Sequence, residues 1–436
     1  MNRNFYVSLT RWKDSKQRKP LILQGARQVG KTYGTKAWSK KHYKNLVYLN
    51  FEKDRQLSAL FEGNLQPLEI LHKIEMHFKV QFNAESDLLF LDEIQQCGKA
   101  LHSLKYFSED LPEAHIIAAG SLLGLHLNSE PFPVGKVQFL DIYPMTFVEF
   151  LEALNKKELY NFSWNKEINA HDHIQLIQYL KYYLLTGGTP EVVSTFISMN
   201  PQTEECWIKV RELQSHLMTA YLADMAKHCG KLNAMNLERL WQNIPNQLAK
   251  EQNKRFHFKN VLPGKNKYSQ MSDLIDWLTS ANLIYKVPIA NQASLPLSAY
   301  TKESFFKLFV FDVGLLAAMS DISHHEILNY NFGTFKGSFI ENFVLQELTY
   351  LFGRKIYSFC EGESEVDFII QHQGKATPIE VKAGVNRKAK SIQRAIQKYE
   401  LTKALRLSLE NLTPTDNSKK LQDIPLYCAG DLQIYK

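Results

Sequence analysis

The chain has 436 residues, of which 44% are hydrophobic and 22% are charged. This length predicts roughly two to four domains, and the composition excludes disordered, collagen-like and disulfide-stapled proteins. Lys and Arg number 52 against 45 Asp and Glu, a formal charge of +7 that allows a polyanionic partner without identifying one.

The cysteine spacing indicates a reducing compartment, and the apolar runs argue against export and membrane spanning. The five cysteines are far apart and never form a Cys-x-x-Cys pair, which argues against a disulfide framework or a zinc knuckle: Cys97, Cys206, Cys229, Cys360 and Cys428. The N-terminal stretch has no unbroken apolar core, and no uncharged apolar run is long enough to span a membrane. We therefore expect a cytoplasmic protein without a membrane partner.

Residues 21–150 predict an α/β domain with a buried parallel sheet. The apolar runs PLILQG, NLVYLNFE, DLLFLDEI and HIIAAGS alternate with amphipathic stretches. Continuous apolar strands separated by helices are typical of a sheet that is covered on both faces.

The remaining chain predicts three further parts. Residues 151–230 have apolar residues at helical spacing, interrupted at Gly187-Gly188-Thr189-Pro190, which we interpret as a hinge. Residues 231–300 suggest a winged-helix-like domain, with a short strand at Phe256–Phe258 and a second strand at LIYKVPI. Residues 301–436 contain a strong helix (GSFIENFVLQELTYLF), a hairpin (EVDFIIQHQGKATPIEVKA) and a basic helix. Together with a first part at 1–150, the expected boundaries are 1–150, 151–230, 231–300 and 301–436.

A phosphate-binding loop is predicted by GARQVGKT, which fits G-x-x-x-x-G-K-[ST] between an apolar strand and a helix. The glycines let backbone N–H groups face phosphate oxygens, Lys31 neutralises the β and γ phosphates, and Thr32 ligates Mg²⁺. A chance glycine-rich turn is the alternative, and Arg27 fits either a phosphate contact or a solvent-facing position. The expected ATP-binding residues are Gly25, Ala26, Arg27, Gln28, Val29, Gly30, Lys31, Thr32 and Tyr33.

The run LLFLDEIQ supplies a second set of groups for phosphoryl transfer. Asp92 at the end of a buried strand is expected to hold Mg²⁺, and Glu93 to orient the water that attacks the γ-phosphate. Adjacent acids also commonly begin a helix, so the assignment depends on the phosphate-binding loop upstream. Ser121 follows the next strand and fits equally a contact to the γ-phosphate and a helix N-cap.

A second candidate site lies in the C-terminal part. Glu380 and Lys382 are two residues apart in a strand and so share a face, while the turn HQGK brings Asp367 near Glu380. With Glu341 from the preceding helix, these carboxylates make a hard oxygen site suited to Mg²⁺ or Mn²⁺, and Lys382 stabilises the phosphorane or activates water. The order helix Glu, strand Asp and Glu-x-Lys is the constellation of metal-dependent nucleases of the restriction-endonuclease type, although a bare D-x(n)-E-x-K also occurs by chance.

Nearly the whole chain resembles prokaryotic AAA-type ATPases with a C-terminal domain of formerly unknown function that has a restriction-endonuclease-like core. The resemblance rests on GARQVGKT, LLFLDEIQ, AAGSLLG, GKVQFLDIYPMTFVEFL, LLTGGTPEVV, FKLFVFDVGLLAA, GSFIENFVLQEL, EVDFII and IEVKAG. It implies an ATP-hydrolysing module, a winged-helix-like middle and a nuclease-like end. One departure is Lys136 after Gly135, where the family usually has arginine, so donation to a neighbouring subunit's nucleotide is in doubt.

Two functions compete. In the first, an ATPase acts on nucleic acid, DNA more than RNA, and its C-terminal site is a nuclease. A basic stretch supports this reading, although a solvated helix face explains it as well: Arg387, Lys388, Lys390, Arg394, Lys398, Lys403 and Arg406. In the second, the nucleotide state governs contact with a protein partner, and the nuclease-like domain is a scaffold. Either function is compatible with a homo-oligomer.

Overall fold

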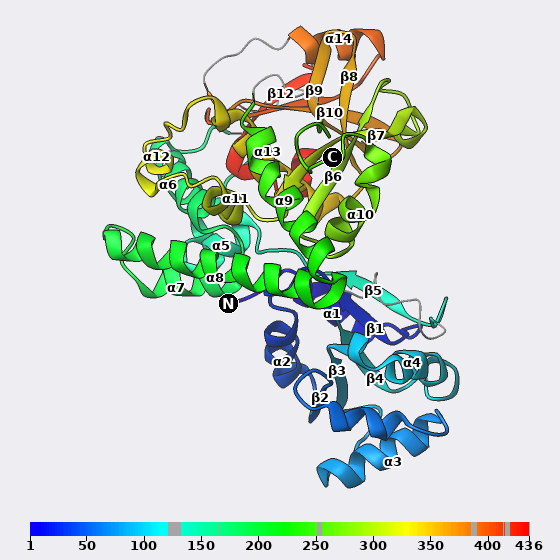
Figure 1. The fold of residues 1–436 in the computed structure, drawn as a ribbon. Coiled ribbons are helices and arrows are strands. Elements are labelled where there is room, and N and C mark those ends of the chain that lie inside the picture. The colour runs from blue at the N-terminus through cyan, green and yellow to red at the C-terminus, as the bar shows by residue number, and fades with distance from the viewer. Residues whose placement is uncertain are drawn as a thin grey trace. The chain divides into compact units, whose positions relative to one another are not determined.

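The computed structural model describes residues 1–120, 132–164, 166–250, 255–384, 390–412, 414 and 419–435. The chain divides into two compact units (Figure 1). Unit 1 comprises Met1–Tyr143 with Ser280–Asn282, and unit 2 comprises Pro144–Thr279 with Leu283–Lys436.

Unit 1 contains a five-stranded sheet in the order β2-β3-β4-β1-β5, with every pair of neighbours parallel. Its strands are β1 (Leu21–Gln24), β2 (Leu46–Asn50), β3 (Leu88–Asp92), β4 (His115–Ala119) and β5 (Gln138–Asp141). Its α-helices are α1 (Phe5–Asp14), α2 (Lys31–His42), α3 (Pro67–Phe78) and α4 (Gly98–Asp110). The predicted α/β architecture and the four predicted strands are confirmed.

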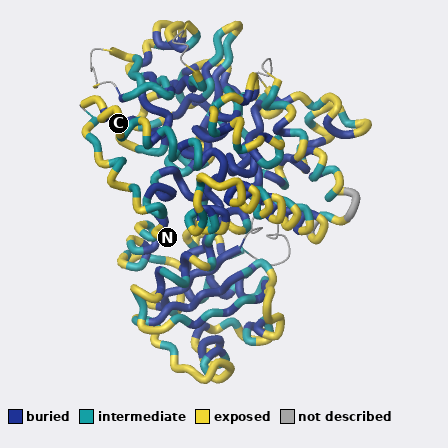
Figure 2. The backbone as a smooth tube through the Cα atoms, turned by 90° about the vertical axis from the view of Figure 1, so that its left-hand side faces the viewer, coloured by how far each residue is buried: buried dark blue, intermediate teal, exposed yellow. Residues whose placement is uncertain are grey.

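Two of the three inner strands of this sheet, β3 and β4, are buried along their whole length. Every residue of β3 and β4 is buried, as the continuous apolar runs predict for strands that are covered on both faces. Figure 2 shows these segments in dark blue, with the exposed residues on the surrounding helices and loops. Burial fixes the strand register and thereby the position of Asp92 at the carboxyl end of β3.

Unit 2 begins with a group of packed helices: α5 (Phe147–Ala153), α6 (Ala170–Thr186), α7 (Pro190–Ser198), α8 (Glu204–Cys229) and α9 (Lys231–Leu248). The predicted break between α6 and α7 is present, but its interpretation as a hinge was wrong. The N–H of Gly188 donates to Oδ2 of Asp312 at 2.7 Å, and Met145 N donates to the carbonyl of Gly188 at 2.7 Å. A buried turn held by hydrogen bonds on both sides is a fixed junction.

The other layer of unit 2 is a mixed seven-stranded sheet in the order β12-β11-β10-β9-β8-β6-β7. The strands are β6 (Ile284–Ala290), β7 (Thr301–Val310), β8 (Ile356–Glu361), β9 (Ser364–His372), β10 (Lys375–Val381), β11 (Ala404–Ser408) and β12 (Leu421–Pro425). The predicted hairpin is confirmed, since β9 and β10 pair antiparallel with Phe368 opposite Ile379. The boundary expected after residue 300 lies between two paired strands, because β6 and β7 are antiparallel neighbours.

Four more helices complete unit 2: α10 (Ser272–Ser280), α11 (Val313–Met319), α12 (His324–Leu328) and α13 (Lys336–Phe352), followed in the chain by the basic helix α14 (Lys390–Lys398). Helix α14 packs on β9 and β10 through Ile392, Ala395 and Ile396. Helix α13 is tied to β7 because the side-chain amide of Asn342 exchanges two hydrogen bonds, each 2.9 Å, with the backbone of Val310.

Two further features concern expectations from the sequence. The prediction of a strand at Phe256–Phe258 was wrong, since the segment is irregular. Among the described residues, its one backbone hydrogen bond to β7 runs from Phe256 N to Phe306 O at 2.7 Å. A single hydrogen bond does not make the repeated inter-strand pairing of a β-ladder. Within the described residues, no helix is long and apolar enough to cross a membrane.

The junction at Gly188 yields a stability prediction. A Cβ at this position would lie 2.2 Å from the carbonyl oxygen and 2.7 Å from the nitrogen of Met145, so Gly188→Ala must displace backbone. We expect a loss of about 1–3 kcal/mol in the free energy of unfolding, measured by chemical denaturation. The control is Gly337→Ala on α13, whose Cβ would meet nothing within 4 Å. Equal stability of the two variants would contradict the fixed junction.

Candidate functional site

The phosphate-binding loop connects β1 to α2, as the motif predicts. Gly30 precedes α2 with a φ of 90°, and Gly25 has a φ of 147°. Glycine is required at residue 25 because a Cβ there would lie 2.1 Å from the carbonyl oxygen of Ile142. The N-terminal N–H groups of α2 therefore begin directly after a loop that only glycine permits, which is the arrangement that binds phosphate.

Lys31 is buried inside this loop, with 7% of its surface exposed. Its ammonium group donates to the carbonyls of Gly25 at 2.9 Å and Ala26 at 2.7 Å. Burial lowers the pKa of Lys31 to about 8, although the carboxylates of Glu93 and Asp92 oppose this shift. The loop carbonyls therefore hold the ammonium group at a position where the negative charge of a phosphate would fully compensate its positive charge.

Asp92 lies where the sequence places it, next to Thr32. Oδ2 of Asp92 accepts hydrogen bonds from Thr32 Oγ1 and from the Tyr48 hydroxyl, both at 2.8 Å, and from Asn50 Nδ2 at 3.3 Å. Tyr48 and Asn50 lie near the end of β2 and were not anticipated. The signal was available, because β2 neighbours β3 and its carboxyl end lies at the same edge of the sheet.

Glu93 follows Asp92 in the left-handed region of backbone space, with a φ of 51°. Its Oε2 accepts a hydrogen bond from Gln95 Nε2 at 2.5 Å. Burial raises the pKa of Glu93, while the Gln95 bond and the charges of Arg27 and Lys31 work in the opposite direction. A carboxylate of raised pKa is a stronger base for a water molecule, and strained backbone is common at functional sites.

The remaining predicted residues of this region have separate outcomes. Arg27 forms an ion pair with Glu52 at 4.0 Å. Tyr33 is 70% exposed, on the first turn of α2. Lys136 forms an ion pair with Glu109 at 2.9 Å. Ser121 lies outside the described residues.

The C-terminal candidate residues converge within unit 2. Asp367 on β9 accepts a hydrogen bond from the Val381 N–H of β10 at 2.6 Å. Lys382, directly after β10, donates to Oε1 of Glu380 at 2.5 Å. Glu341 of α13 and Asp367 line one cavity of about 230 Å³. The helix and the hairpin therefore bring the four predicted side chains to one region of the domain.

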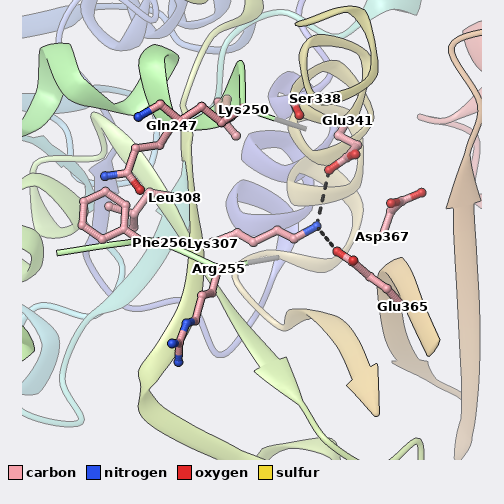
Figure 3. A pocket seen from close by; sticks show the side chains of 11 residues that line it. Gln247, Lys250, Arg255, Phe256, Lys307, Leu308, Ser338, Glu341, Glu365 and Asp367 are labelled. Carbon is pink, nitrogen blue, oxygen red and sulfur yellow. Dashed lines mark ion pairs between the residues drawn. The ribbon is translucent and has the colours of Figure 1, made fainter. Parts of the chain in front are cut away.

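Two residues of this region were missed from the sequence. Lys307 of β7 reaches between two acids, with its ammonium group 3.0 Å from Glu365 and 3.6 Å from Glu341 (Figure 3). Both residues had a signal: Lys307 is the one cation in the apolar run FFKLFVF, and Glu365 precedes Asp367 by two positions on one strand.

The acids and lysines influence one another's protonation. Burial, followed by the carboxylates of Glu341 and Glu380, raises the pKa of Asp367 well above its usual value. Burial also raises the pKa of Glu380, against the opposing bond from Lys382. Burial alone would lower the pKa of Lys307, but the carboxylates of Glu341, Glu365 and Asp367 outweigh it and raise that pKa. The lysine is therefore charged in its buried position.

One atom of this cluster fits a metal ligand. Glu380 is 8% exposed, and among the described residues its buried Oε2 has no hydrogen-bond partner. A buried carboxylate oxygen without a donor is costly unless a cation compensates it. The donor set is made of carboxylate oxygens, which Mg²⁺ and Mn²⁺ prefer. The residues present therefore fit a hard divalent cation.

The basic stretch beyond β10 is only partly available for a polyanion. Lys398 donates to Glu361 at 2.7 Å, and Arg406 binds both carboxylate oxygens of Asp423 at 2.5 and 2.7 Å. Lys390 and Arg394 lie on the exposed side of α14. Arg387 and Lys388 are outside the described residues. Of the five predicted cations that the structure describes, Lys398 and Arg406 therefore have acidic partners within the domain.

Three segments match known families. Residues 17–151 match the family described as AAA domain, residues 177–326 a "Domain of unknown function (DUF8612)", and residues 336–428 a "Domain of unknown function (DUF4143)". The expected AAA-type ATPase domain and C-terminal domain of unknown function are confirmed. The AAA domain supports ATP binding and hydrolysis, for which Mg²⁺ is the usual metal.

The chain is also similar to individual proteins. An uncharacterized protein of Methanocaldococcus jannaschii is 26% identical over 396 residues, 90% of this chain and 80% of that protein. A Walker-type ATPase of Pyrococcus abyssi is 15% identical, with a TM-score of 0.45 over 73% of this chain and 95% of its own. The Orc1 protein of Aeropyrum pernix, solved in complex with DNA, is 11% identical with a TM-score of 0.33, over 74% and 93% of the two chains.

The burial of Lys31 predicts a pH dependence of nucleotide binding. Because phosphate favours the charged amine, the affinity for ADP should fall as pH rises through about 8, roughly tenfold for each further pH unit. Titration calorimetry between pH 7 and pH 9.5 measures this profile. In Lys31→Arg the side chain stays charged throughout, so its binding, although weaker, should vary little with pH. Parallel profiles would exclude Lys31 as the titrating group.

Proposed function

We propose that this protein is an ATP-hydrolysing enzyme whose C-terminal domain cuts phosphodiester bonds of nucleic acid with a divalent metal. The observation that carries the second half is the unpartnered, buried Oε2 of Glu380 beside Lys382 and Asp367. An unpaired carboxylate oxygen destabilises a folded protein, and a bound cation would compensate it.

In unit 1, the roles follow from position. Lys31 would exchange its loop carbonyls for the β and γ phosphates, and Thr32 would turn its hydroxyl from Asp92 to Mg²⁺. Asp92 would then help to hold the ion. Glu93, held by Gln95, would accept a hydrogen bond from the attacking water. Ser121 remains a prediction for the γ-phosphate contact.

In unit 2, Asp367 and Glu380 would hold Mg²⁺ or Mn²⁺, and Glu341 would complete the acidic wall. The cation would polarise a phosphate oxygen and lower the pKa of an attacking water. Lys382 is hydrogen-bonded to Glu380 and partly exposed, so its ammonium group would stabilise the negative charge that develops on the phosphate. These roles need no group beyond this chain and one cation.

A polyanionic substrate suits the charge of this domain. Lys250 and Arg255 are exposed and line the same cavity as Glu341 and Asp367, so cationic and acidic groups share one opening. Cations at the rim would bind the phosphate backbone on either side of the bond that the acids attack. Such contacts do not read sequence, so we propose sequence-tolerant binding, to DNA more than RNA.

The ATPase assignment predicts that two substitutions have different effects. Lys31→Ala should weaken ATP binding, because the buried cation that meets the phosphates is lost. Glu93→Gln should retain binding but lower the rate of hydrolysis by about 10²–10⁴-fold, since the amide is not a base. Phosphate release and binding of a fluorescent ATP analogue measure the two properties. The control is Glu85→Gln, an exposed acid in a turn, which should change neither. Unchanged hydrolysis in Glu93→Gln would refute the role of Glu93.

The nuclease assignment predicts metal-dependent cleavage. Wild type, incubated with plasmid, linear duplex and single strands of DNA and RNA, should cleave with Mg²⁺ or Mn²⁺ and not with chelator. Asp367→Asn and Lys382→Ala should each lower cleavage by at least about 10²-fold and leave ATP binding intact, because the phosphate-binding loop lies in the other unit.

The control for this assay is Glu363→Gln, an exposed acid in the turn between β8 and β9. Cleavage that survives Asp367→Asn would mean another site or a contaminant. Absence of cleavage under every metal and nucleotide condition would favour the alternative function, a nucleotide switch that binds a protein partner through a nuclease-like scaffold.

A further inference from the structure

Lys307 is an unusual residue for its position. It lies on β7 between Phe306 and Leu308, which are 1% and 3% exposed, and is itself only 8% exposed. Its side chain extends into the acidic cavity, which its neighbour Leu308 also lines. Removing an ammonium group from water costs several kcal/mol unless other charges compensate it, so this lysine depends on its neighbours.

Those neighbours are three of the acids of the C-terminal site. The ammonium group lies 3.0 Å from Glu365 and 3.6 Å from Glu341, and Asp367 stands beside them in the same cavity (Figure 3). Lys382 pairs with the fourth acid, Glu380, through Oε1 of that glutamate. The two lysines therefore enter the cluster from different strands and neutralise different acids.

The charges of the cluster can be added directly. When a cation binds, it displaces any proton from these acids, so the four carboxylates, Glu341, Glu365, Asp367 and Glu380, contribute −4. Lys307 and Lys382 contribute +2, which leaves −2 before the cation is counted. One divalent cation would bring this sum to zero, whereas two would leave +2 in a buried place. Without Lys307 the sum would be −3, which favours additional cation.

We propose that Lys307 is a permanent cation of the C-terminal site that occupies the place of a second metal, so that the site takes up a single divalent ion at Asp367 and Glu380. This inference rests on the metal site proposed above and specifies its stoichiometry. The ion pairs of Lys307 keep Glu341 and Glu365 from binding the metal. Its positive charge also stabilises the fold of the site before a metal binds. It acts on the metal ligands through charge, and so is a positioning residue.

The test counts Mn²⁺ bound to the nucleotide-free full chain by electron paramagnetic resonance, with Asp367→Asn defining the ions bound elsewhere. Wild type should bind one more ion than Asp367→Asn. Lys307→Met, which keeps the side-chain length without the charge, should bind two more, or one at least about tenfold more tightly. Lys307→Arg retains the charge and should match wild type in number.

Stability in chelator gives a second readout. Lys307→Met leaves three acids uncompensated, so its melting temperature in EDTA should fall, and Mn²⁺ should restore it far more than it raises that of wild type. Should Lys307→Met fold poorly, the double variant Lys307→Met with Glu365→Gln returns the cluster to −2. It should be more stable than Lys307→Met in EDTA and bind one ion.

The outcomes separate this inference from the proposed function. Two ions in wild type, or Lys307→Met equal to wild type in ion number, affinity and stability in EDTA, would overturn the role of Lys307 and leave a metal-dependent nuclease possible. No ion in wild type but one in Lys307→Met would overturn the single-ion site and the proposed cleavage, and would leave Lys307 as a structural cation of a scaffold.

Discussion

A charge that is removed from water must be compensated by hydrogen bonds or by other charges, and both candidate sites depend on this constraint. In the phosphate-binding loop, two carbonyls hold the buried ammonium group of Lys31 until phosphate replaces them. In the C-terminal cluster, Lys307 and Lys382 hold acids that would otherwise repel one another. In both places the buried charges are compensated within the chain, by carbonyls in one and by opposite charges in the other.

The packing of unit 2 serves the same purpose at longer range. Helix α13 carries Glu341 on the side of the cavity, and its next residue, Asn342, exchanges two hydrogen bonds with Val310 at the end of β7. Lys307 lies on that strand, three residues earlier. The distance between Glu341 and Lys307 is consequently set by buried backbone contacts, which position a functional pair more rigidly than surface loops do.

The sequence was most informative where a local pattern and a chemical motif coincide. GARQVGKT and LLFLDEIQ placed Lys31, Thr32 and Asp92, because glycine spacing and an apolar strand restrict the backbone locally. The hairpin that joins Asp367 to Glu380 was equally accessible from its alternation and turn. The winged-helix and endonuclease-like assignments remain predictions, because the families that match these segments are of unknown function.

What only the tertiary structure decided concerns pairs that are distant in sequence. Lys307 and Glu365 are 58 positions apart, and no local period indicates that β7 and β9, which do not pair, present their side chains to one cavity. The fixed turn at Gly188 likewise depends on Asp312, from a different helix. The sequence by itself determined strands, turns and motif residues, because these follow from short-range sterics and burial. The sheet order of unit 2 and its charge pairing arose from long-range packing, which short-range patterns do not encode.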